Sequence, residues 1–251
     1  MTVLRVENLA KSYGGVRALD GVSFSVAAGE LLALIGPNGA GKSTCFNIVN
    51  GQLRADAGRV WLGGHYVTGA SPRRMAHAGV GRTFQVAQVF GSMTVRENVQ
   101  TALLAQRRRI FQFFKPLATQ MREEANGLLS DTGLIERADS AAAALAYGDV
   151  KRLELAMALA ARPKLLLMDE PTAGMGIEER LALMALIRRL AGAGSIAVLF
   201  TEHSMDVVFG HADRVIVLAG GRLIAEGTPA AVRADPRVVS SYLGRYAGEG
   251  A

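Results

Sequence analysis

The 251-residue chain contains one cysteine, one tryptophan and no long uninterrupted hydrophobic run. The single cysteine, Cys45, excludes internal disulfide bonds and is typical of proteins of a reducing compartment. The richest apolar runs, such as Leu31 to Ile35, have the length of a strand, whereas a membrane-spanning helix needs roughly 18 apolar residues. The amino-terminal residues lack an apolar core followed by a small-residue cleavage site, so we expect no signal peptide. Any role at a membrane is therefore expected to be peripheral.

Acidic residues are fewer than basic ones: 22 Asp and Glu stand against 28 Lys and Arg, which gives a formal net charge of +6. Such an excess is compatible with a nucleic acid or an anionic membrane surface as partner, but on charge alone an ordinary solvated basic surface is the favoured interpretation. The only dense basic run, Arg107 to Arg109, is followed by an aromatic cluster that ends at Phe114. The sequence leaves open whether this segment contacts lipid or a membrane protein, or packs within the fold.

The first half of the chain combines strand patterns with a helical insertion. Val3 to Leu9 and Val22 to Val26 alternate or cluster apolar residues between turn residues, which predicts antiparallel strands. Leu31 to Ile35 predicts a buried strand, followed by a glycine-rich turn and a helix from about Lys42 to Asn50. Alanine, leucine, glutamate and arginine dominate from about Thr94 to Ala144, which indicates helices.

The second half contains further buried strands. Lys164 to Met168 and Ser195 to Phe200 are apolar without alternation, as strands of a parallel sheet are. Between them, Glu178 to Ala191 has the length of a helix, and strand patterns at residues 214–218 and 222–225 precede two short helices. The alternation predicts an α/β fold with a mostly parallel sheet, an antiparallel β subdomain and an inserted α-helical subdomain.

We expect the whole chain to form one domain. Its expected parts are an α/β core with the β subdomain at about residues 1–90 and 146–230, a helical subdomain at about 91–145, and a helical tail at about 231–251.

The glycine-rich turn after Ile35 carries the strongest chemical signal. Glycines in such a loop let backbone amides point at a phosphate, and a lysine reaches the terminal phosphates of a nucleotide. The amino terminus of the next helix adds a favourable dipole. The pattern predicts a P-loop NTPase core that binds ATP, with the Lys42 ammonium on the β and γ phosphates and the Ser43 hydroxyl on Mg²⁺. The predicted nucleotide-binding residues are Gly36, Pro37, Asn38, Gly39, Ala40, Gly41, Lys42, Ser43 and Thr44.

An acidic pair follows the predicted strand Lys164 to Met168. Strand ends of a parallel sheet share one crevice, so Asp169 and Glu170 should face the phosphate loop. We interpret the pair as a Walker B element, in which Asp169 binds Mg²⁺ and Glu170 is the general base that polarises the attacking water. A lone histidine is usually structural, but His203 lies just past the next strand and is placed to bridge water and the γ-phosphate.

In this order, these elements resemble the nucleotide-binding subunit of ATP-binding-cassette (ABC) transporters, and the likeness covers nearly the whole chain. Tyr13 matches the aromatic residue that stacks on adenine in that family. Gln85, in Thr-Phe-Gln, matches the glutamine loop that senses Mg²⁺ and contacts the membrane subunit. Leu145 to Asp149, just before a predicted helix, occupies the place of the Leu-Ser-Gly-Gly-Gln signature. Taken singly, these residues could be a strand-edge aromatic, a solvated loop residue and a helix cap.

The resemblance implies that two cassettes pair head to tail around ATP. Each nucleotide then lies between one subunit's phosphate loop and the other's signature, here Ala146, Tyr147 and Gly148. The signature backbone and the helix amino terminus supply further dipoles for the γ-phosphate. ATP therefore holds the two subunits together, and its hydrolysis lets them separate. The implied catalytic residues are Glu170, His203, Lys42 and Gln85, and the implied Mg²⁺ ligands are Ser43, Gln85 and Asp169.

Two segments depart from the family pattern. Ala146 replaces the signature serine, Tyr147 its first glycine and Asp149 its glutamine. The next contact loop, usually Ser-Ala-Leu-Asp, reads Ala-Gly-Met-Gly over Ala173 to Gly176 and lacks the carboxylate. The signature half of the site is therefore altered, whereas the phosphate-loop half is intact.

The Leu-Ala-Tyr-Gly signature is similar to that of bacterial importers of branched-chain amino acids and related amides or carboxylates. So are Thr94 to Asn98 and the tail segments Glu226 to Pro229 and Ser241 to Gly244. This subgroup implies a second ATPase subunit, two transmembrane permease subunits, indirectly a periplasmic binding protein, and a peripheral location on the cytoplasmic face of the inner membrane.

Three alternatives remain at this stage: the motor of an exporter, a non-catalytic regulatory cassette, and an ABC ATPase that acts on nucleic acid. Glu170 and His203 argue against a regulatory cassette, because loss of either would be the simplest route to that role. The single phosphate loop and the absence of a long heptad run argue against nucleic acid as a partner. An exporter is distinguished from an importer by another protein, because only an importer is accompanied by a periplasmic binding protein.

The altered signature generates a first prediction. We expect a heterodimer in which this subunit's own ATP meets a more ordinary signature of a partner cassette, so that the two sites are unequal. ATPase rates of the separate and mixed cassettes, measured with the transporter, test this. A chain that alone drives its transporter as fast as the mixture contradicts the hypothesis.

Overall fold

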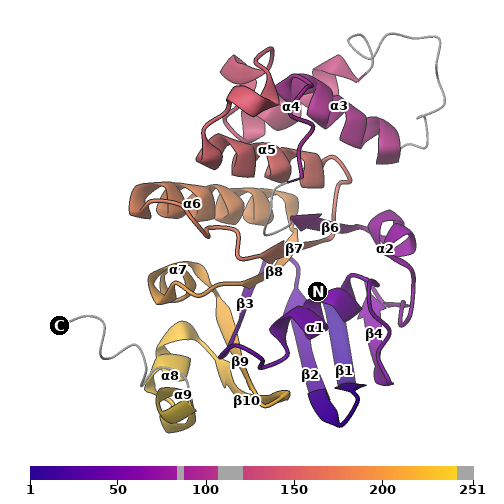
Figure 1. Ribbon diagram of the computed structural model, residues 1–251, viewed down its shortest axis with the longest axis vertical. Coiled ribbons are helices and arrows are strands. Elements are labelled where there is room, and N and C mark those ends of the chain that lie inside the picture. Colours follow the sequence, from indigo (N-terminus) through magenta and orange to yellow (C-terminus); the bar gives the residue numbers. More distant parts are fainter. Residues whose placement is uncertain (84–87, 107–120, 242–251) are drawn as a thin grey trace.

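The computed structural model describes residues 1–83, 88–106 and 121–241, which contain two sheets flanked by helices (Figure 1). The first sheet has the strand order β2-β1-β4-β5, and its neighbouring strands pair antiparallel. This sheet forms the β subdomain. Its strands are β1 (Thr2–Tyr13), β2 (Val16–Ala27), β4 (Ala57–Leu62) and β5 (His65–Tyr66).

The second sheet has the order β10-β9-β3-β8-β7-β6 and carries the chemistry. Five neighbouring strands run parallel and β10 pairs antiparallel at one edge. Its strands are β3 (Leu31–Ile35), β6 (Val80–Thr83), β7 (Leu165–Asp169), β8 (Ala197–Thr201), β9 (Arg214–Ala219) and β10 (Arg222–Gly227).

Strand β3 shows why the central strands lack alternation, because both of its faces are buried. Leu32 and Leu34 join a core that includes Phe46 of helix α1 (Lys42–Val49) and lies against the antiparallel sheet. Leu31 and Ile35 point into a second core on the opposite face. Apolar side chains on both faces thus hold the strand in the middle of the molecule.

Helices cover the outer face of the large sheet, and short helices form the last part of the described chain. Helix α6 packs Leu183, Met184 and Ile187 into the second core. Helix α2 begins where the Ser71 hydroxyl accepts a hydrogen bond from the Arg74 amide at 3.4 Å, a common helix cap. The bounds are α2 (Pro72–Ala78), α6 (Ile177–Gly194), α7 (Met205–His211), α8 (Pro229–Ala234) and α9 (Pro236–Ser241).

A helical subdomain lies beyond α6, at the end of the molecule opposite the tail helices (Figure 1). It contains α3 (Val95–Gln106), α4 (Arg122–Asp131), α5 (Tyr147–Leu159) and 3₁₀ turns at Ile135–Arg137 and Ala142–Ala144. These helices share a third core, to which α5 contributes Leu153 and Ala156. Helix α3 begins with a reciprocal cap, because the Thr94 amide donates to Glu97 Oε2 and the Glu97 amide donates to Thr94 Oγ1.

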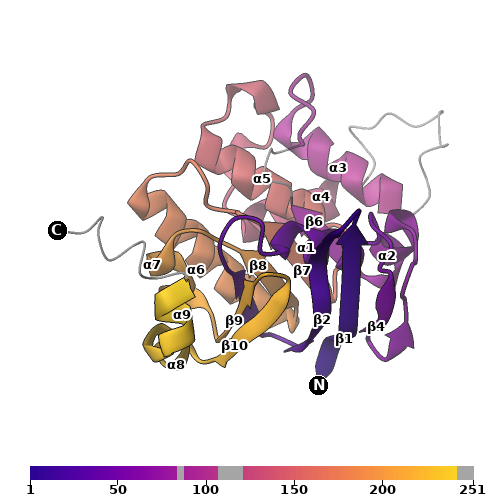
Figure 2. The same cartoon turned by 60° about the horizontal axis from the view of Figure 1, so that its bottom comes forward.

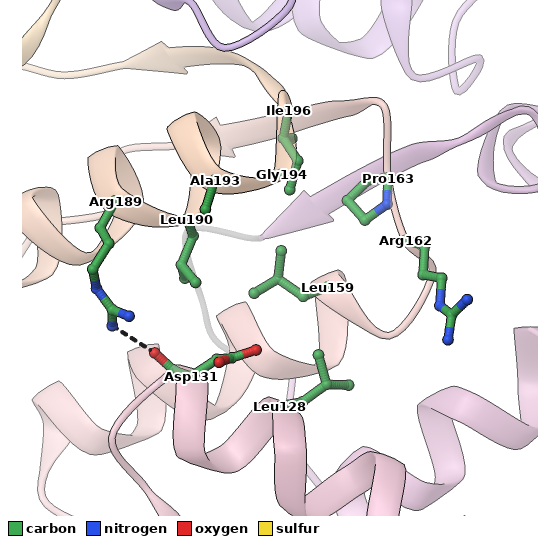
Figure 3. A pocket seen from close by; sticks show the side chains of 10 residues that line it. All are labelled: Leu128, Asp131, Leu159, Arg162, Pro163, Arg189, Leu190, Ala193, Gly194 and Ile196. Carbon is green, nitrogen blue, oxygen red and sulfur yellow. Dashed lines mark hydrogen bonds between the residues drawn. The ribbon is translucent and has the colours of Figure 1, made fainter.

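A cavity of about 430 Å³ separates the helical subdomain from the carboxyl-terminal end of α6 (Figure 3). Leucine side chains of α4, α5 and α6 face it, and the Arg189 guanidinium donates to the Asp131 carbonyl oxygen at 2.8 Å across one side. Its lining consists of Leu128, Asp131, Leu159, Arg162, Pro163, Arg189, Leu190, Ala193, Gly194 and Ile196.

The predicted α/β architecture is confirmed. Strand β3 has its predicted bounds, but β1 and β2 extend further into their shared hairpin than the apolar pattern indicated. The elements between residues 57 and 83 were not predicted. Helix α5 begins inside the signature motif, at Tyr147, and not after it. Within the described residues, every helix is too short or too polar to cross a membrane.

The packing of α1 between the two sheets generates a second prediction (Figure 2). Phe46 has no exposed surface, so Phe46→Ala should lower the free energy of unfolding by about 3–5 kcal/mol. Leu181→Ala is the control, because Leu181 is 46% exposed and should change stability by less than about 0.5 kcal/mol. Denaturant titration followed by tryptophan fluorescence measures both. Equal unfolding midpoints would show that α1 is not held by this core.

Candidate active site

The carboxyl ends of three neighbouring strands meet at one edge of the large sheet. Strand β8 pairs with β3 on one side and with β7 on the other, all in parallel. The segments that follow these strands line a common cavity of about 210 Å³. Its lining consists of Ala18, Asn38, Gly39, Ala40, Gly41, Lys42, Ser43, Thr44, Glu170 and His203. The structure therefore brings the predicted loop together with Glu170 and His203.

The loop packs closely against strand β2, and Gly41 shows why glycine is needed. Its φ angle of 103° disfavours side chains, and an added Cβ would lie 2.3 Å from the Ala18 carbonyl oxygen of β2. Helix α1 begins at the next residue, so its free amides and its dipole face the cavity. This arrangement suits a phosphate group.

Lys42 supplies a buried cation at this helix terminus. Its Nζ donates to the carbonyl oxygens of Gly36 at 2.7 Å and Pro37 at 3.1 Å. Burial lowers the pKa of the Lys42 ammonium, while the carboxylates of Glu170 and Asp169 oppose that shift. The lysine thus lies within the electrostatic reach of both predicted acidic residues.

The acidic pair is fixed by the neighbouring strand β8. The Thr201 hydroxyl donates to Asp169 Oδ1 at 2.7 Å and accepts from the Glu170 amide at 3.1 Å. Glu170 has a φ angle of 48°, a conformation that costs a residue with a side chain about 1–2 kcal/mol. The backbone therefore turns sharply between the two carboxylates, and Asp169 and Glu170 can face different parts of the cavity.

His203 pairs directly with Glu170. The distance from His203 Nε2 to Glu170 Oε1 is 2.9 Å, and both side chains keep some exposed surface. The His203 backbone amide donates to Glu202 Oε2 at 3.1 Å. A carboxylate and an imidazole in hydrogen-bond contact beside a phosphate cradle can orient and deprotonate a water molecule.

Arg82 of β6 approaches the same site from the side. Its guanidinium donates to Asn47 Oδ1 of α1 at 3.1 Å and to Gln52 Oε1 at 2.7 Å, and lies 3.7 Å from Asp169 Oδ2. Burial lowers the pKa of Arg82, and the Asp169 carboxylate opposes that shift. Arg82 thereby places a second cation next to the predicted metal ligand.

The oxygen donors at the site fit a magnesium ion. Mg²⁺ commonly binds through one carboxylate or hydroxyl and completes its shell with phosphate and water. Ser43, on the first turn of α1, offers a hydroxyl, and Asp169 offers a carboxylate. Among the described residues, no cluster of three or more His, Cys, Asp or Glu side chains could hold a metal by itself.

Comparison with known proteins identifies the family. A family model described as ABC transporter matches residues 19–173, which is more than half of the chain. The chain belongs to the ABC transporter family. A second model, described as branched-chain amino acid ATP-binding cassette transporter, matches residues 222–248 of the cassette.

The cassette is similar over nearly its full length to ATP-binding proteins of branched-chain amino acid transport. It is 36% identical to the high-affinity protein BraF of Pseudomonas aeruginosa over 252 residues, which cover 96% of this chain and 98% of BraF. It is 35% identical to LivG of Escherichia coli K12, with the same shares covered. The family and the subgroup resemblance expected from the sequence are confirmed.

Solved cassettes share its architecture. The ADP conformation of MJ1267, an ATP-binding cassette of an ABC transporter, superposes with a TM-score of 0.88 at 36% identity, covering 97% of this chain and 99% of MJ1267. A nucleotide-free cassette from an ABC transporter has a TM-score of 0.84 at 35% identity, with 96% and 99% covered.

Tyr13, Ala146, Tyr147 and Gly148 are not among the residues that line the cavity. Tyr13 ends β1, is 51% exposed and has Lys11 Nζ at 5.7 Å from its ring. Ala146 caps α5, and Tyr147 and Gly148 form its first turn. Gln85 lies outside the described residues, as does the basic and aromatic run from Arg107 to Phe114.

Sequence reasoning missed several residues of the site. Thr201 and Glu202 directly precede His203 at the end of a predicted strand, and this position was the available signal. Ala18 lies on β2 and lines the cavity, and Arg82 lies on β6 beside Asp169. Nothing in the local sequence of either residue indicated a place at the site.

The loop geometry generates a third prediction. Gly41→Ala forces a Cβ against the Ala18 carbonyl oxygen, so the cradle must shift and ATP affinity should fall at least about 10-fold. Gly21→Ala is the control, because Gly21 has a φ angle of 74° but nothing within 4 Å of an added Cβ. Titration with a fluorescent ATP analogue compares them. Equal affinities would refute the role of close packing at Gly41.

Proposed function

We propose that the cassette binds and hydrolyses MgATP and thereby drives a bacterial importer for branched-chain amino acids or related small amides and carboxylates. The observation that carries the proposal is the single cavity that joins the phosphate loop to the Glu170 and His203 pair. Binding and bond cleavage need these two halves within reach of one γ-phosphate.

Each residue of the cavity has a proposed role. Loop amides from Gly36 to Thr44 bind the phosphates, and Lys42 neutralises their charge as its ammonium leaves the Gly36 carbonyl for an anion. Glu170 accepts the proton of the attacking water, and His203 orients that water and the γ-phosphate. When bound, Mg²⁺ would withdraw charge from the phosphate oxygens, and Ser43, Asp169 and Gln85 are its proposed protein contacts.

The proposed active form is a head-to-tail pair of cassettes. Tyr147 is 48% exposed at the amino terminus of α5, and nearby on α6 Ile177 is 72% and Leu181 46% exposed. Exposed apolar residues beside a helix amino terminus suit a protein interface that also meets a phosphate. The lost signature hydroxyl at Ala146 favours a second, different cassette as the partner.

The proposed setting is the cytoplasmic face of the bacterial inner membrane. Two permease subunits and, indirectly, a periplasmic binding protein complete the proposed assembly, and we propose that Gln85 and Tyr13 contact a permease subunit and adenine respectively. The role of BraF and LivG in high-affinity branched-chain amino acid transport supports the cargo class, as does the match of residues 222–248 to a branched-chain amino acid cassette model.

The general base generates a fourth prediction. Glu170→Gln keeps the size of the side chain but removes its basicity, so ATP hydrolysis should fall by about 10²–10⁴-fold while ATP still binds. The variant should accumulate as a dimer in size-exclusion chromatography with MgATP, because the nucleotide that joins the subunits is not cleaved.

The control is Glu123→Gln, an exposed glutamate on the first turn of α4. It should hydrolyse ATP at the wild-type rate. Substantial turnover by Glu170→Gln would remove Glu170 as the base. A wild-type chain that binds ATP but neither hydrolyses it nor dimerises alone would instead indicate that activity requires a different partner cassette.

A further inference from the structure

The altered signature residue Tyr147 makes a contact that glycine could not make. Its hydroxyl donates to the Ala173 carbonyl oxygen at 3.1 Å. An added Cβ on Gly174 would lie 3.5 Å from the Tyr147 ring, so the ring packs on the backbone of that loop. The amino terminus of α5 is thus fastened to the loop that follows Glu170.

The same loop is fastened to the His203 segment by a buried carboxylate. Glu202 Oε1 accepts from the Thr172 amide at 2.9 Å and from the Thr172 hydroxyl at 2.6 Å, and Oε2 accepts from the His203 amide at 3.1 Å. Glu202 is 3% and Thr172 2% exposed. A buried carboxylate is costly unless it is hydrogen-bonded, so three donors define its geometry.

These contacts form a continuous path, which we call the polar relay: Tyr147, Ala173, Thr172, Glu202, His203 and Glu170. Every step is a hydrogen bond or a peptide link. It begins at the amino terminus of α5 and ends at the pair beside the phosphate loop.

Helices α5 and α6 also pack closely at the amino terminus of α5, where the relay begins. An added Cβ on Gly148 would lie 3.2 Å from Glu179 Oε1, so the first turn of α5 lies close to α6. At the opposite end of α6 the helices are separated by the cavity of Figure 3. The amino-terminal ends of α5 and α6 are therefore in close contact where the relay begins.

We propose that Tyr147 and Glu202 are positioning residues, through which the amino terminus of α5 holds Glu170 and His203 in their catalytic geometry. This inference rests on the proposed function of Glu170 as the base and on the proposed head-to-tail pair. Because that pair places α5 against the partner's ATP, the relay links occupancy of one nucleotide site to the base of the other.

The fifth prediction concerns Tyr147→Phe, Glu202→Gln and the double variant, each in the assembled transporter. Tyr147→Phe removes one hydrogen bond and should lower kcat about 2- to 10-fold without changing KM for ATP. Glu202→Gln places an amide N–H against a donor and should lower kcat at least about 10-fold. In a continuous relay, the double variant should be no slower than Glu202→Gln alone.

Tyr66→Phe is the matched control, because Tyr66 is an exposed tyrosine of β5 in the other sheet and its variant should keep the wild-type kcat. A wild-type kcat for Tyr147→Phe overturns the relay. So does a double variant whose loss is the product of the two single losses.

Hydrogen exchange without nucleotide separates this inference from the proposed function. Tyr147→Phe should weaken protection of the amides at residues 170–176 and 201–204, whichever residue is the base. Unchanged protection overturns the relay even if Glu170→Gln abolishes hydrolysis. Weakened protection together with an active Glu170→Gln variant would keep the contact path and reject Glu170 as the base.

Discussion

The parallel ladder of β3, β8 and β7 is the constraint on which the site depends. Parallel strands end at the same edge, so three segments distant in sequence are delivered to one place. Separate apolar cores on the two faces hold this sheet between α1 and α6. The residues after each strand need only local turns to reach a shared cavity, and the chemistry is a result of the topology.

Charge is balanced at that edge before any nucleotide binds. Asp169 and Glu170 lie near the buried Lys42 ammonium, whose pKa both carboxylates affect, and the partly buried Arg82 guanidinium lies beside Asp169. Thr201 separates the roles of the acidic pair, because one hydroxyl bonds to the first carboxylate and to the backbone of the second residue. A polyanion with Mg²⁺ therefore enters a site in which each charge already has an opposite neighbour.

The sequence was informative where function follows from adjacent residues. The phosphate loop and the Asp169-Glu170 pair are contiguous and follow apolar runs, so both the elements and their shared edge could be predicted. Ala18 and Arg82 enter through strand pairing and helix contacts that no local pattern records. Residues 57–83 mix polar and apolar residues because β4 is only partly covered, and the apolar periodicity that predicts strands was too weak there.

The cavity between the helical subdomain and the carboxyl-terminal end of α6 has a consequence for how the helical subdomain can move. The cavity is open to solvent and leucine side chains of three helices face it, so closing it would remove apolar surface from water. With the subdomain fastened at the Tyr147 end, a small turn about that end would close or widen the gap at the other. A turn that closes the gap would bury the leucine side chains that face it and would therefore carry a negative change in heat capacity, so the preferred orientation of the helical subdomain would depend on temperature.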